Sequence, residues 1–186
     1  LKAIKLKPDF AEAYSNLSGT LNDLGQLKEA EILARKAIEL KPDFAIAYSN
    51  LGGILQDLGK SKEAEISIRK AIQLKPDLAE AYSNLAGILQ ALGNLKEAEI
   101  SARKSIRIKP NFANSHCILG IILLDLGKSQ EAELSIHKAI ELNPKLAKAH
   151  LNMGVILIER GKLKEAEVYA RKAIQLNPKL AKAHLN

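Results

Sequence analysis

The sequence has no tryptophan, one cysteine and one methionine, and its aromatic residues are four tyrosines and three phenylalanines. A single cysteine, Cys117, excludes an internal disulfide and a cysteine-ligated metal cluster. It is compatible with a reducing compartment, so we expect a cytoplasmic location. With so few aromatic side chains, the 47% of hydrophobic residues must build a core from alanine, leucine and isoleucine.

Long apolar runs and targeting signals are missing as well. No stretch approaches the ~18–20 apolar residues that a membrane-spanning helix needs. No signal-peptide pattern opens the chain, and we expect no membrane partner. The chain also lacks an initiator methionine and starts in the middle of a repeat, so we expect it to be a fragment of a longer protein.

The charge balance is basic, with 28 Lys and Arg residues against 21 Asp and Glu residues and a net charge of +7. Charge of this kind bears on association and solubility rather than on fold. Nucleic-acid binding would add aromatic residues for stacking or a continuous basic stripe, and neither is clear. The basic residues mostly alternate with glutamate in the second half of each repeat, so nucleic acid is not the expected partner.

A self-similar segment organises the chain. AYSNLGGILQDLG at 47–59 returns as AYSNLSGTLNDLG at 13–25 and AYSNLAGILQALG at 81–93, with looser copies at 115–127 and 149–161. A fixed period of 34 residues indicates a repeat array. The prolines that keep this interval are Pro8, Pro42, Pro76, Pro110, Pro144 and Pro178. The five whole repeats are 11–44, 45–78, 79–112, 113–146 and 147–180, and the partial repeats are 1–10 and 181–186. Positions within a repeat are counted from 1 to 34.

The residue pattern of each repeat predicts two helices. In the second repeat, Ala47, Leu51 and Leu55 follow helical spacing, and Gly59 ends that helix, as glycine does after a last turn. A second helix is expected over about 62–75. The following proline stops it, because proline lacks an amide hydrogen and clashes with the preceding turn. The expected fold class is therefore all-α.

The recurring residues resemble those of the tetratricopeptide repeat family over nearly the whole chain. They are an aromatic residue or histidine at position 4, an apolar residue at 7, a small one at 8, alanine at 20, alanine or serine at 27 and proline at 32. Ile68 and Ile136 depart from the pattern at position 24, which we expect to alter local packing only. The resemblance implies a right-handed superhelical solenoid of antiparallel helix pairs, one array over residues 1–186, that binds proteins and is not catalytic.

Residues for catalysis or cofactor binding do not form a recognisable motif. There is no glycine-rich phosphate loop and no nucleophile elbow. His116, His150 and His184 are 34 residues apart, so stacking of the repeats separates them too far to share a metal through bonds of ~2 Å. We interpret them as packing residues that replace tyrosine. Cys117 has no matching base, and we expect neither enzyme activity nor a cofactor or metal.

One face of the first helices carries a polar pattern in the first three repeats. Serine, asparagine and glycine occupy positions 5, 6 and 9, and asparagine or glutamine occupies position 12. Glycine lets a ligand backbone approach closely, and an asparagine amide offers a donor and an acceptor that match a peptide unit. The candidate peptide-binding residues are Ser15, Asn16, Gly19, Asn22, Ser49, Asn50, Gly53, Gln56, Ser83, Asn84, Gly87, Gln90 and Asn152.

The asparagines at position 6 are similar to those in the tetratricopeptide arm of O-linked N-acetylglucosamine transferases, which bind the substrate backbone. The matching residues are Asn16, Asn50, Asn84, Asn152 and Asn186. Ile118 interrupts the series in the fourth repeat. The resemblance implies a concave groove that holds an extended peptide by its main chain. The alternative is that three recently duplicated repeats share a neutral polar surface.

In the last two repeats the same face becomes apolar. Its residues are Cys117, Ile118, Ile121, Leu124, Leu151, Val155 and Ile158. A contiguous apolar surface usually marks a contact. The contact is an apolar ligand segment, a helix outside the fragment or another copy of the chain. The ends of the array carry no polar cap, so end-to-end association is a further expectation.

These patterns together predict a scaffold that binds a protein or an extended peptide. Two alternatives stay open. The chain is either the substrate-selecting arm of a larger transferase, whose catalytic domain lies outside it, or a structural segment that associates end to end.

Overall fold

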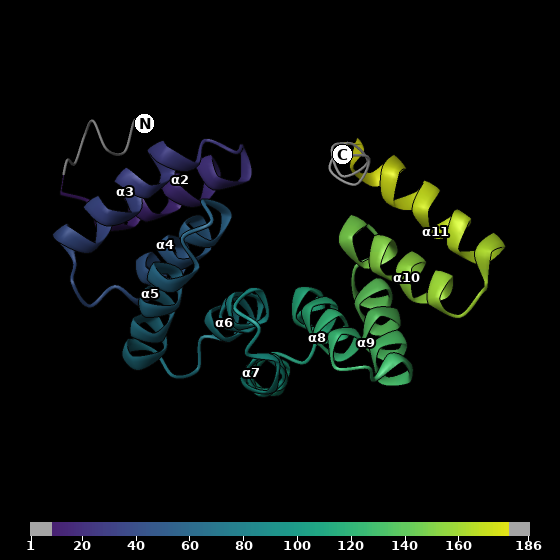
Figure 1. The fold of residues 1–186 in the computed structure, drawn as a ribbon. Coiled ribbons are helices and arrows are strands. Elements are labelled where there is room, and N and C mark those ends of the chain that lie inside the picture. The colour runs from purple at the N-terminus through teal and green to yellow at the C-terminus, as the bar shows by residue number, and fades with distance from the viewer. Residues whose placement is uncertain (1–8, 179–186) are drawn as a thin grey trace. The chain divides into compact units, whose positions relative to one another are not determined.

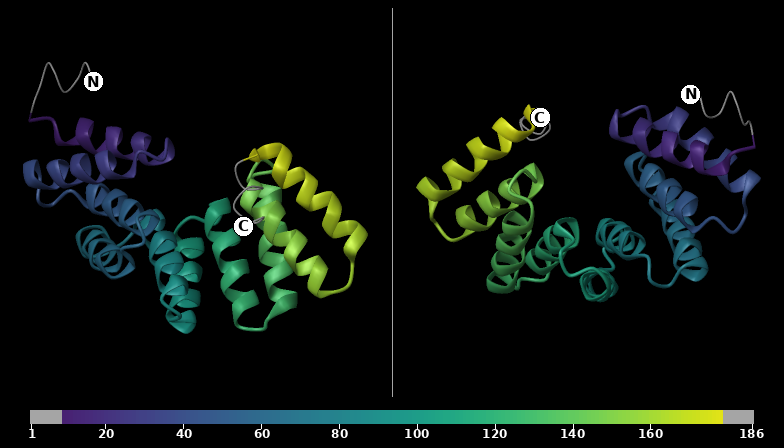
Figure 2. Two further views of the ribbon diagram at one scale, coloured as in Figure 1. Left: turned by 45° about the horizontal axis from the view of Figure 1, so that its top comes forward. Right: turned by 180° about the vertical axis from the view of Figure 1, so that it is seen from behind.

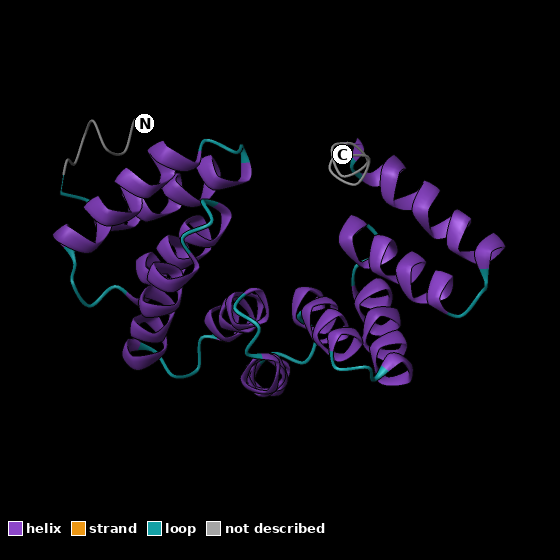
Figure 3. Ribbon diagram, in the orientation of Figure 1, coloured by secondary structure: helices purple, strands orange, loops and turns teal. Residues whose placement is uncertain are grey.

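The computed structural model describes residues 9–178, and Figure 1 shows its helices along the chain. All regular secondary structure of these residues is helical (Figure 3). The helices are α2 (Ala11–Asp23), α3 (Leu27–Leu40), α4 (Ala45–Asp57), α5 (Ser61–Leu74), α6 (Ala79–Ala91), α7 (Leu95–Ile108), α8 (Ala113–Asp125), α9 (Ser129–Leu142), α10 (Ala147–Glu159) and α11 (Leu163–Leu176). The protein is an all-α helical repeat solenoid, as its sequence predicted.

The chain divides into two compact units, of which the first ends at Asn94 and the second begins at Leu95. The first unit contains α2 to α6 and the second contains α7 to α11. Within each unit, the two helices of a repeat pack together, and each second helix also packs on the first helix of the next repeat. Figure 2 shows these helix pairs from two further sides. The right-handed superhelix and the single array depend on how the units are joined, and both stay predictions.

The helix ends lie close to where the sequence predicts them. Helix α4 ends at Asp57, and Gly59 follows in the left-handed region with φ of 76°. The amide of Lys60 then donates to the Leu55 carbonyl oxygen at 2.8 Å, which satisfies an end group of the helix. Helix α5 runs one residue earlier than expected at both ends, over Ser61–Leu74.

The core is built from alanine, leucine and isoleucine, as expected. The alanine at position 20 is almost completely buried in all five repeats. In the second, fourth and fifth repeats it lies where the paired helices approach each other. The largest fully buried side chains in the first unit are Ile54, Leu55, Ile68, Ile88 and Leu89. Those in the second unit are Ile122, Leu123, Ile136 and Ile156. No helix within residues 9–178 combines the length and apolar character that crossing a membrane requires.

The isoleucines at position 24 are explained by the residue at position 8. A Cβ atom on Gly52 would lie 2.4 Å from Cγ1 of Ile68, and one on Gly120 would lie 2.5 Å from Cδ1 of Ile136. The isoleucine fills the space that the missing side chain leaves. The departure from the family pattern therefore comes as a matched pair of residues, and its effect is confined to packing within one repeat.

Candidate functional site

The serines at position 5 are buried. The exposed fractions of Ser15, Ser49 and Ser83 are 0%, 4% and 2%. These three candidate peptide-binding residues therefore have almost no surface that a ligand could contact. In the first repeat the reason is visible: Asn50 from the next repeat contacts Ser15 and covers it.

Asn50 is held in one orientation by Ser15. Its Nδ2 atom donates to the Ser15 carbonyl oxygen at 3.1 Å and to Ser15 Oγ at 3.1 Å. A backbone carbonyl oxygen can only accept, so the nitrogen side of the amide must face Ser15. The donor of Asn50 is thus used inside the protein. The prediction that this amide offers both a donor and an acceptor is corrected to an acceptor alone.

The second unit repeats this contact with other atoms. Asn152 Nδ2 donates to Cys117 Sγ at 3.5 Å, in the same register as Asn50 and Ser15. Cys117 is only 4% exposed, and burial raises the pKa of its thiol to about 11. Cys117 therefore does not belong to an exposed apolar surface, and its thiol is neutral and shielded at pH 7.

Two glycines at position 9 lie beneath the asparagines of the following repeat. A Cβ atom on Gly19 would lie 3.8 Å from Asn50 Nδ2, and one on Gly53 would lie 3.8 Å from Asn84 Nδ2. These are ordinary van der Waals distances, so the packing of the protein itself does not require glycine here. Glycine inside a helix costs ~1 kcal/mol relative to alanine. The unused space above both glycines is therefore a feature that a ligand would explain.

The structure brings the remaining predicted polar residues of the first unit onto the first helices α2, α4 and α6. We call this set the polar face, and it consists of Asn16, Gly19, Asn50, Gly53, Gln56, Asn84, Gly87 and Gln90. Gln56 extends toward Gly87, where a Cβ atom would lie 3.4 Å from its Nε2 atom. The members of the polar face are exposed or half-buried.

Asn22 lies at the edge of this face and has a structural partner. Its Nδ2 atom donates to Asp57 Oδ2 at 3.1 Å, whereas its Oδ1 atom is buried without a hydrogen-bond partner. The amide is therefore engaged between α2 and α4 rather than offered to solvent. The exposed carboxylates of Asp23 and Asp57 border the polar face on this side and favour a ligand that brings hydrogen-bond donors.

The predicted apolar residues of the second unit differ in exposure. Val155 is 41% exposed and Ile158 is 57% exposed. The half-buried members are Ile118, Ile121, Leu124 and Leu151. We call these six residues, on α8 and α10, the apolar face. Asn152 lies beside it and is half-buried.

The histidines at position 4 have partners within the protein. His116 Nε2 and His150 Nε2 each lie 2.8 Å from the carbonyl oxygen of a preceding proline, Pro110 and Pro144 respectively. Since a carbonyl oxygen only accepts, each Nε2 atom carries the proton. These contacts agree with the predicted packing role of both side chains. His184 and Asn186 lie outside the described residues, and the described part of the chain has no group of His, Cys, Asp or Glu that could hold a metal.

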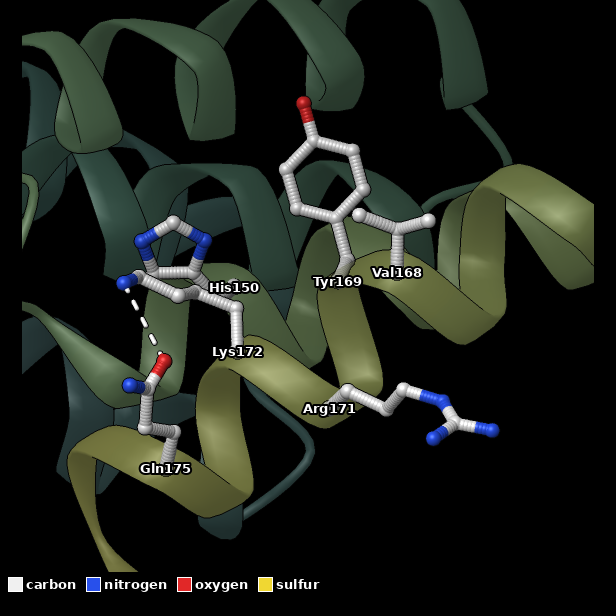
Figure 4. Close-up of a pocket in the computed structure, with 6 residues that line it drawn as sticks. All are labelled: His150, Val168, Tyr169, Arg171, Lys172 and Gln175. Atoms are coloured by element: carbon white, nitrogen blue, oxygen red, sulfur yellow. Dashed lines mark hydrogen bonds between the residues drawn. The ribbon is translucent and has the colours of Figure 1, made fainter.

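A hollow of about 360 Å³ lies beside α11 and is drawn in Figure 4. His150 and Tyr169 form one wall, with ring centroids 5.8 Å apart. Lys172 Nζ donates to Gln175 Oε1 at 3.3 Å, and Arg171 points away from His150 toward Glu167. The basic groups are thus engaged with neighbours on α11. The hollow offers no pair of groups arranged for acid–base or nucleophilic chemistry.

One surface feature was missed from the sequence. The basic residues of the second helices alternate with glutamate in the sequence, and four Glu–Arg ion pairs form on these helices. However, position 22 carries a large aliphatic side chain in all five repeats, and these side chains are 66% to 73% exposed. They are Ile32, Ile66, Ile100, Leu134 and Val168. The fixed recurrence of an aliphatic residue directly after a glutamate was the signal that could have revealed them.

Comparisons with known proteins agree with this architecture. Family models described as tetratricopeptide repeat match residues 10–41, 43–111, 113–146 and 147–180. No curated protein sequence matches the chain.

Several solved structures are similar to the chain. One is YrrB, described as a TPR protein with an unusual peptide-binding site, with 25% identity, a TM-score of 0.61, and coverage of 95% of this chain and 91% of that one. A thermophilic TPR protein of Thermus thermophilus has 22% identity, a TM-score of 0.85 and coverage of 94% and 95%. PilF of Pseudomonas aeruginosa has 23% identity, a TM-score of 0.74 and coverage of 94% and 84%.

Proposed function

Because the chain belongs to the tetratricopeptide repeat family and is a protein-interaction scaffold, we propose that its first unit binds an extended peptide across the polar face. The observation that carries the proposal is the pairing of Gly19 with Asn50. A bare stretch of helix backbone lies there next to an amide whose orientation is fixed by the protein. Gly53 and Asn84 repeat the contact between glycine and asparagine one repeat later.

The chemistry of this pairing selects the ligand. With its nitrogen engaged by Ser15, Asn50 presents an acceptor oxygen, and a backbone N–H of a peptide is the matching donor. The absence of a Cβ atom at Gly19 allows that backbone to come close. Preorganisation of the amide lowers the ordering cost of binding. An array of such acceptors would bind a main chain with little regard to its side chains.

We further propose that the apolar face of the second unit contacts apolar side chains of the bound protein. Val155 and Ile158 support this, since they are large aliphatic residues that are 41% and 57% exposed. Burying an aliphatic side chain of this size stabilises a complex by about 1.5–3 kcal/mol before binding costs. The likeness to YrrB, whose description names a peptide-binding site, is consistent with a peptide ligand for this chain as well.

A pair of glycine substitutions tests the polar face. Peptides selected by display on the unaltered chain would be titrated against the variant Gly19→Ala/Gly53→Ala by calorimetry. Each added methyl group meets only an asparagine amide at 3.8 Å, so we expect the variant to be folded and more stable by up to ~1 kcal/mol per site. We expect its peptide affinity to fall about tenfold, which corresponds to ~1.4 kcal/mol.

The matched control is Gly154→Ala, a glycine-to-alanine change in the second unit at a buried position of α10. It should be stabilising and leave peptide affinity unchanged. Equal affinity of the selected peptides for the Gly19→Ala/Gly53→Ala variant and the unaltered chain would exclude the polar face. The exposed pair Val155→Ser/Ile158→Ser tests the apolar face in the same assay, with the same readout.

The alternative that the chain serves a larger transferase stays a prediction. It would use the same polar face to hold an acceptor polypeptide. The assay above therefore establishes whether the face binds peptides. A catalytic domain joined to these repeats in one chain would favour the transferase interpretation.

A further inference from the structure

We propose that the outer face of the second unit forms a two-fold symmetric dimer with a second copy of this chain, through helices α7 and α9. The proposal concerns the second helices of the repeats and does not depend on the polar face. It starts from Ile100 and Leu134, which are 68% and 73% exposed. Exposed aliphatic side chains of this size on neighbouring helices indicate a contact surface.

Helices α7 and α9 are neighbours on this face. Arg103 on α7 forms an ion pair with Glu131 on α9 at 3.1 Å. Glu99 on α7 forms another with Lys128, which immediately precedes α9, at 2.9 Å. Ile100 and Leu134 therefore belong to one continuous surface of the second unit.

A hollow between the two helices gives this surface a concave part. It measures about 390 Å³, and its apolar walls include Ile106 of α7, Leu119 of α8 and Leu134 of α9. Ser135 and His116 also line it, and His116 is smaller than the tyrosine found at position 4 in earlier repeats. The surface thus has both protruding aliphatic side chains and a hollow that an aliphatic side chain of a second copy would fill.

The charges of α7 and α9 indicate which partner covers this surface. Helix α7 carries Lys96, Arg103, Lys104 and Arg107 against Glu97 and Glu99, a net charge of +2. Helix α9 carries Lys138 against Glu131, Glu133 and Glu141, a net charge of −2 with histidine neutral. A positive helix beside a negative one is complementary to the same pair turned by 180°. In such an isologous contact, α7 of each copy faces α9 of the other.

The symmetry also fixes which ends meet. Helices α7 and α9 occupy the same place in successive repeats, so they run in the same direction. A two-fold axis that lies in the interface, parallel to the helices, places α7 over α9 of the partner and keeps the two helices parallel. The last turn of α7, which contains Arg107, then faces the last turn of α9, which contains Glu141. Both side chains are exposed.

The test is the molar mass of the 186-residue chain by sedimentation equilibrium over a range of concentrations and salt. The expected result is a monomer–dimer equilibrium that weakens with added salt, because the charged pairs lie at a solvent-accessible rim. Leu134→Glu should raise the dissociation constant at least about tenfold. The matched control is Ile66→Glu, since Ile66 occupies the same position on α5 of the first unit and is 71% exposed. It should leave the dimer unchanged.

A charge swap separates this interface from other modes of association. Arg107→Glu and Glu141→Arg should each weaken the dimer, and the double variant should restore it. A chain that is monomeric at all concentrations would overturn the proposal and indicate another occupant for the face. Equal weakening by Ile66→Glu, or a mass that grows beyond that of a dimer, would overturn it in favour of another surface or end-to-end association.

Discussion

Gly52 and Ile68 form a matched pair across the two helices of the second repeat: a Cβ atom on Gly52 would lie 2.4 Å from Cγ1 of Ile68. The first repeat has Ser18 and Ala34 at these two positions, and both are fully buried. The fifth repeat combines Gly154 with Ala170, and a Cβ atom there would lie 3.5 Å from its nearest neighbour, the Ala166 carbonyl oxygen. Packing therefore requires glycine at position 8 in the second repeat, whereas it leaves room for alanine at this position in the fifth.

Gly52→Ala should therefore destabilise the protein, whereas Gly154→Ala should stabilise it. Overpacking a filled core costs about 1–3 kcal/mol, which exceeds the ~1 kcal/mol that alanine gains over glycine in a helix. We expect a net loss of up to ~2 kcal/mol for Gly52→Ala and a gain of up to ~1 kcal/mol for Gly154→Ala. Urea unfolding measures both.

The double variant Gly52→Ala/Ile68→Ala places alanine at both positions, as in the sequence of the third repeat, and serves as the control. Truncation of Ile68 should cost less in the Gly52→Ala background than alone, with a coupling energy of ~1 kcal/mol or more in a double-mutant cycle. Additive effects would mean that the two side chains do not compete for the same space.

Cys117→Ser should be tolerated, because serine occupies this position in the first three repeats. Asn152 would then donate to a hydroxyl oxygen as Asn50 does to Ser15. We expect a change in unfolding free energy within ~1 kcal/mol. Cys117→Val leaves the Asn152 amide without that acceptor and should cost ~1 kcal/mol more than the serine variant. A valine variant as stable as the serine variant would show that the contact contributes nothing.

The thiol of Cys117 should react with a thiol reagent only after unfolding. Burial raises its pKa from 9.0 to about 11, and the reactive species is the thiolate. We expect the rate at pH 8 in native buffer to be at least ~100-fold below the rate in urea. Since the folded pKa is the higher one, the thiol contributes stability that is present below pH ~9 and is lost as the pH rises toward 11. Fast labelling of the native protein would contradict the burial of this residue.

Acid pH should lower the free energy of unfolding of both units, through Glu31 in the first unit and Glu99 in the second. The side-chain hydrogen bonds of Lys60 and then Arg35 lower the pKa of Glu31, and those of Lys128 and then Arg103 lower the pKa of Glu99. A lowered folded pKa gives stability that is present above the unfolded pKa of ~4.3 and is lost as the pH falls through the folded value. At neutral pH, Glu31→Gln/Glu99→Gln should cost about 0.2–1 kcal/mol per ion pair.

The same double variant should flatten the dependence of the unfolding free energy on pH between about 5 and 3. Its control is Glu29→Gln, which alters an exposed glutamate in the first turn of α3. A pH profile that the double variant and the control change to the same extent would show that the ion pairs of Glu31 and Glu99 are not responsible.

Much of the fold could be predicted because its causes are local. The 34-residue period, the glycine after each first helix and the proline after each second helix are features of neighbouring residues along the chain. Gly59 ends α4 and Pro76 follows α5 because of their own backbone restrictions. The choice of a small residue at position 20 follows equally from the close approach of two helices joined by a short turn.

The candidate site was predicted only in part, since its character depends on contacts between repeats. Helical spacing placed Ser15, Asn16 and Gly19 on one face of α2. It could not show that Asn50, 35 residues later, covers Ser15 and donates a hydrogen bond to its carbonyl oxygen. Nor could it show that Cys117 lies under Asn152.

The sequence alone thus determined the helices, their ends and the register of the repeats, because each depends on residues within one or two turns. The tertiary structure alone decided which polar atoms are still available, which glycines are required and which aliphatic side chains lie in solvent. Glycine is required at position 52 only because Ile68 packs beside it. Leu134 is exposed only because no helix of the described chain covers it. These properties depend on how two helices pack against each other, and the sequence of a single helix does not specify that packing.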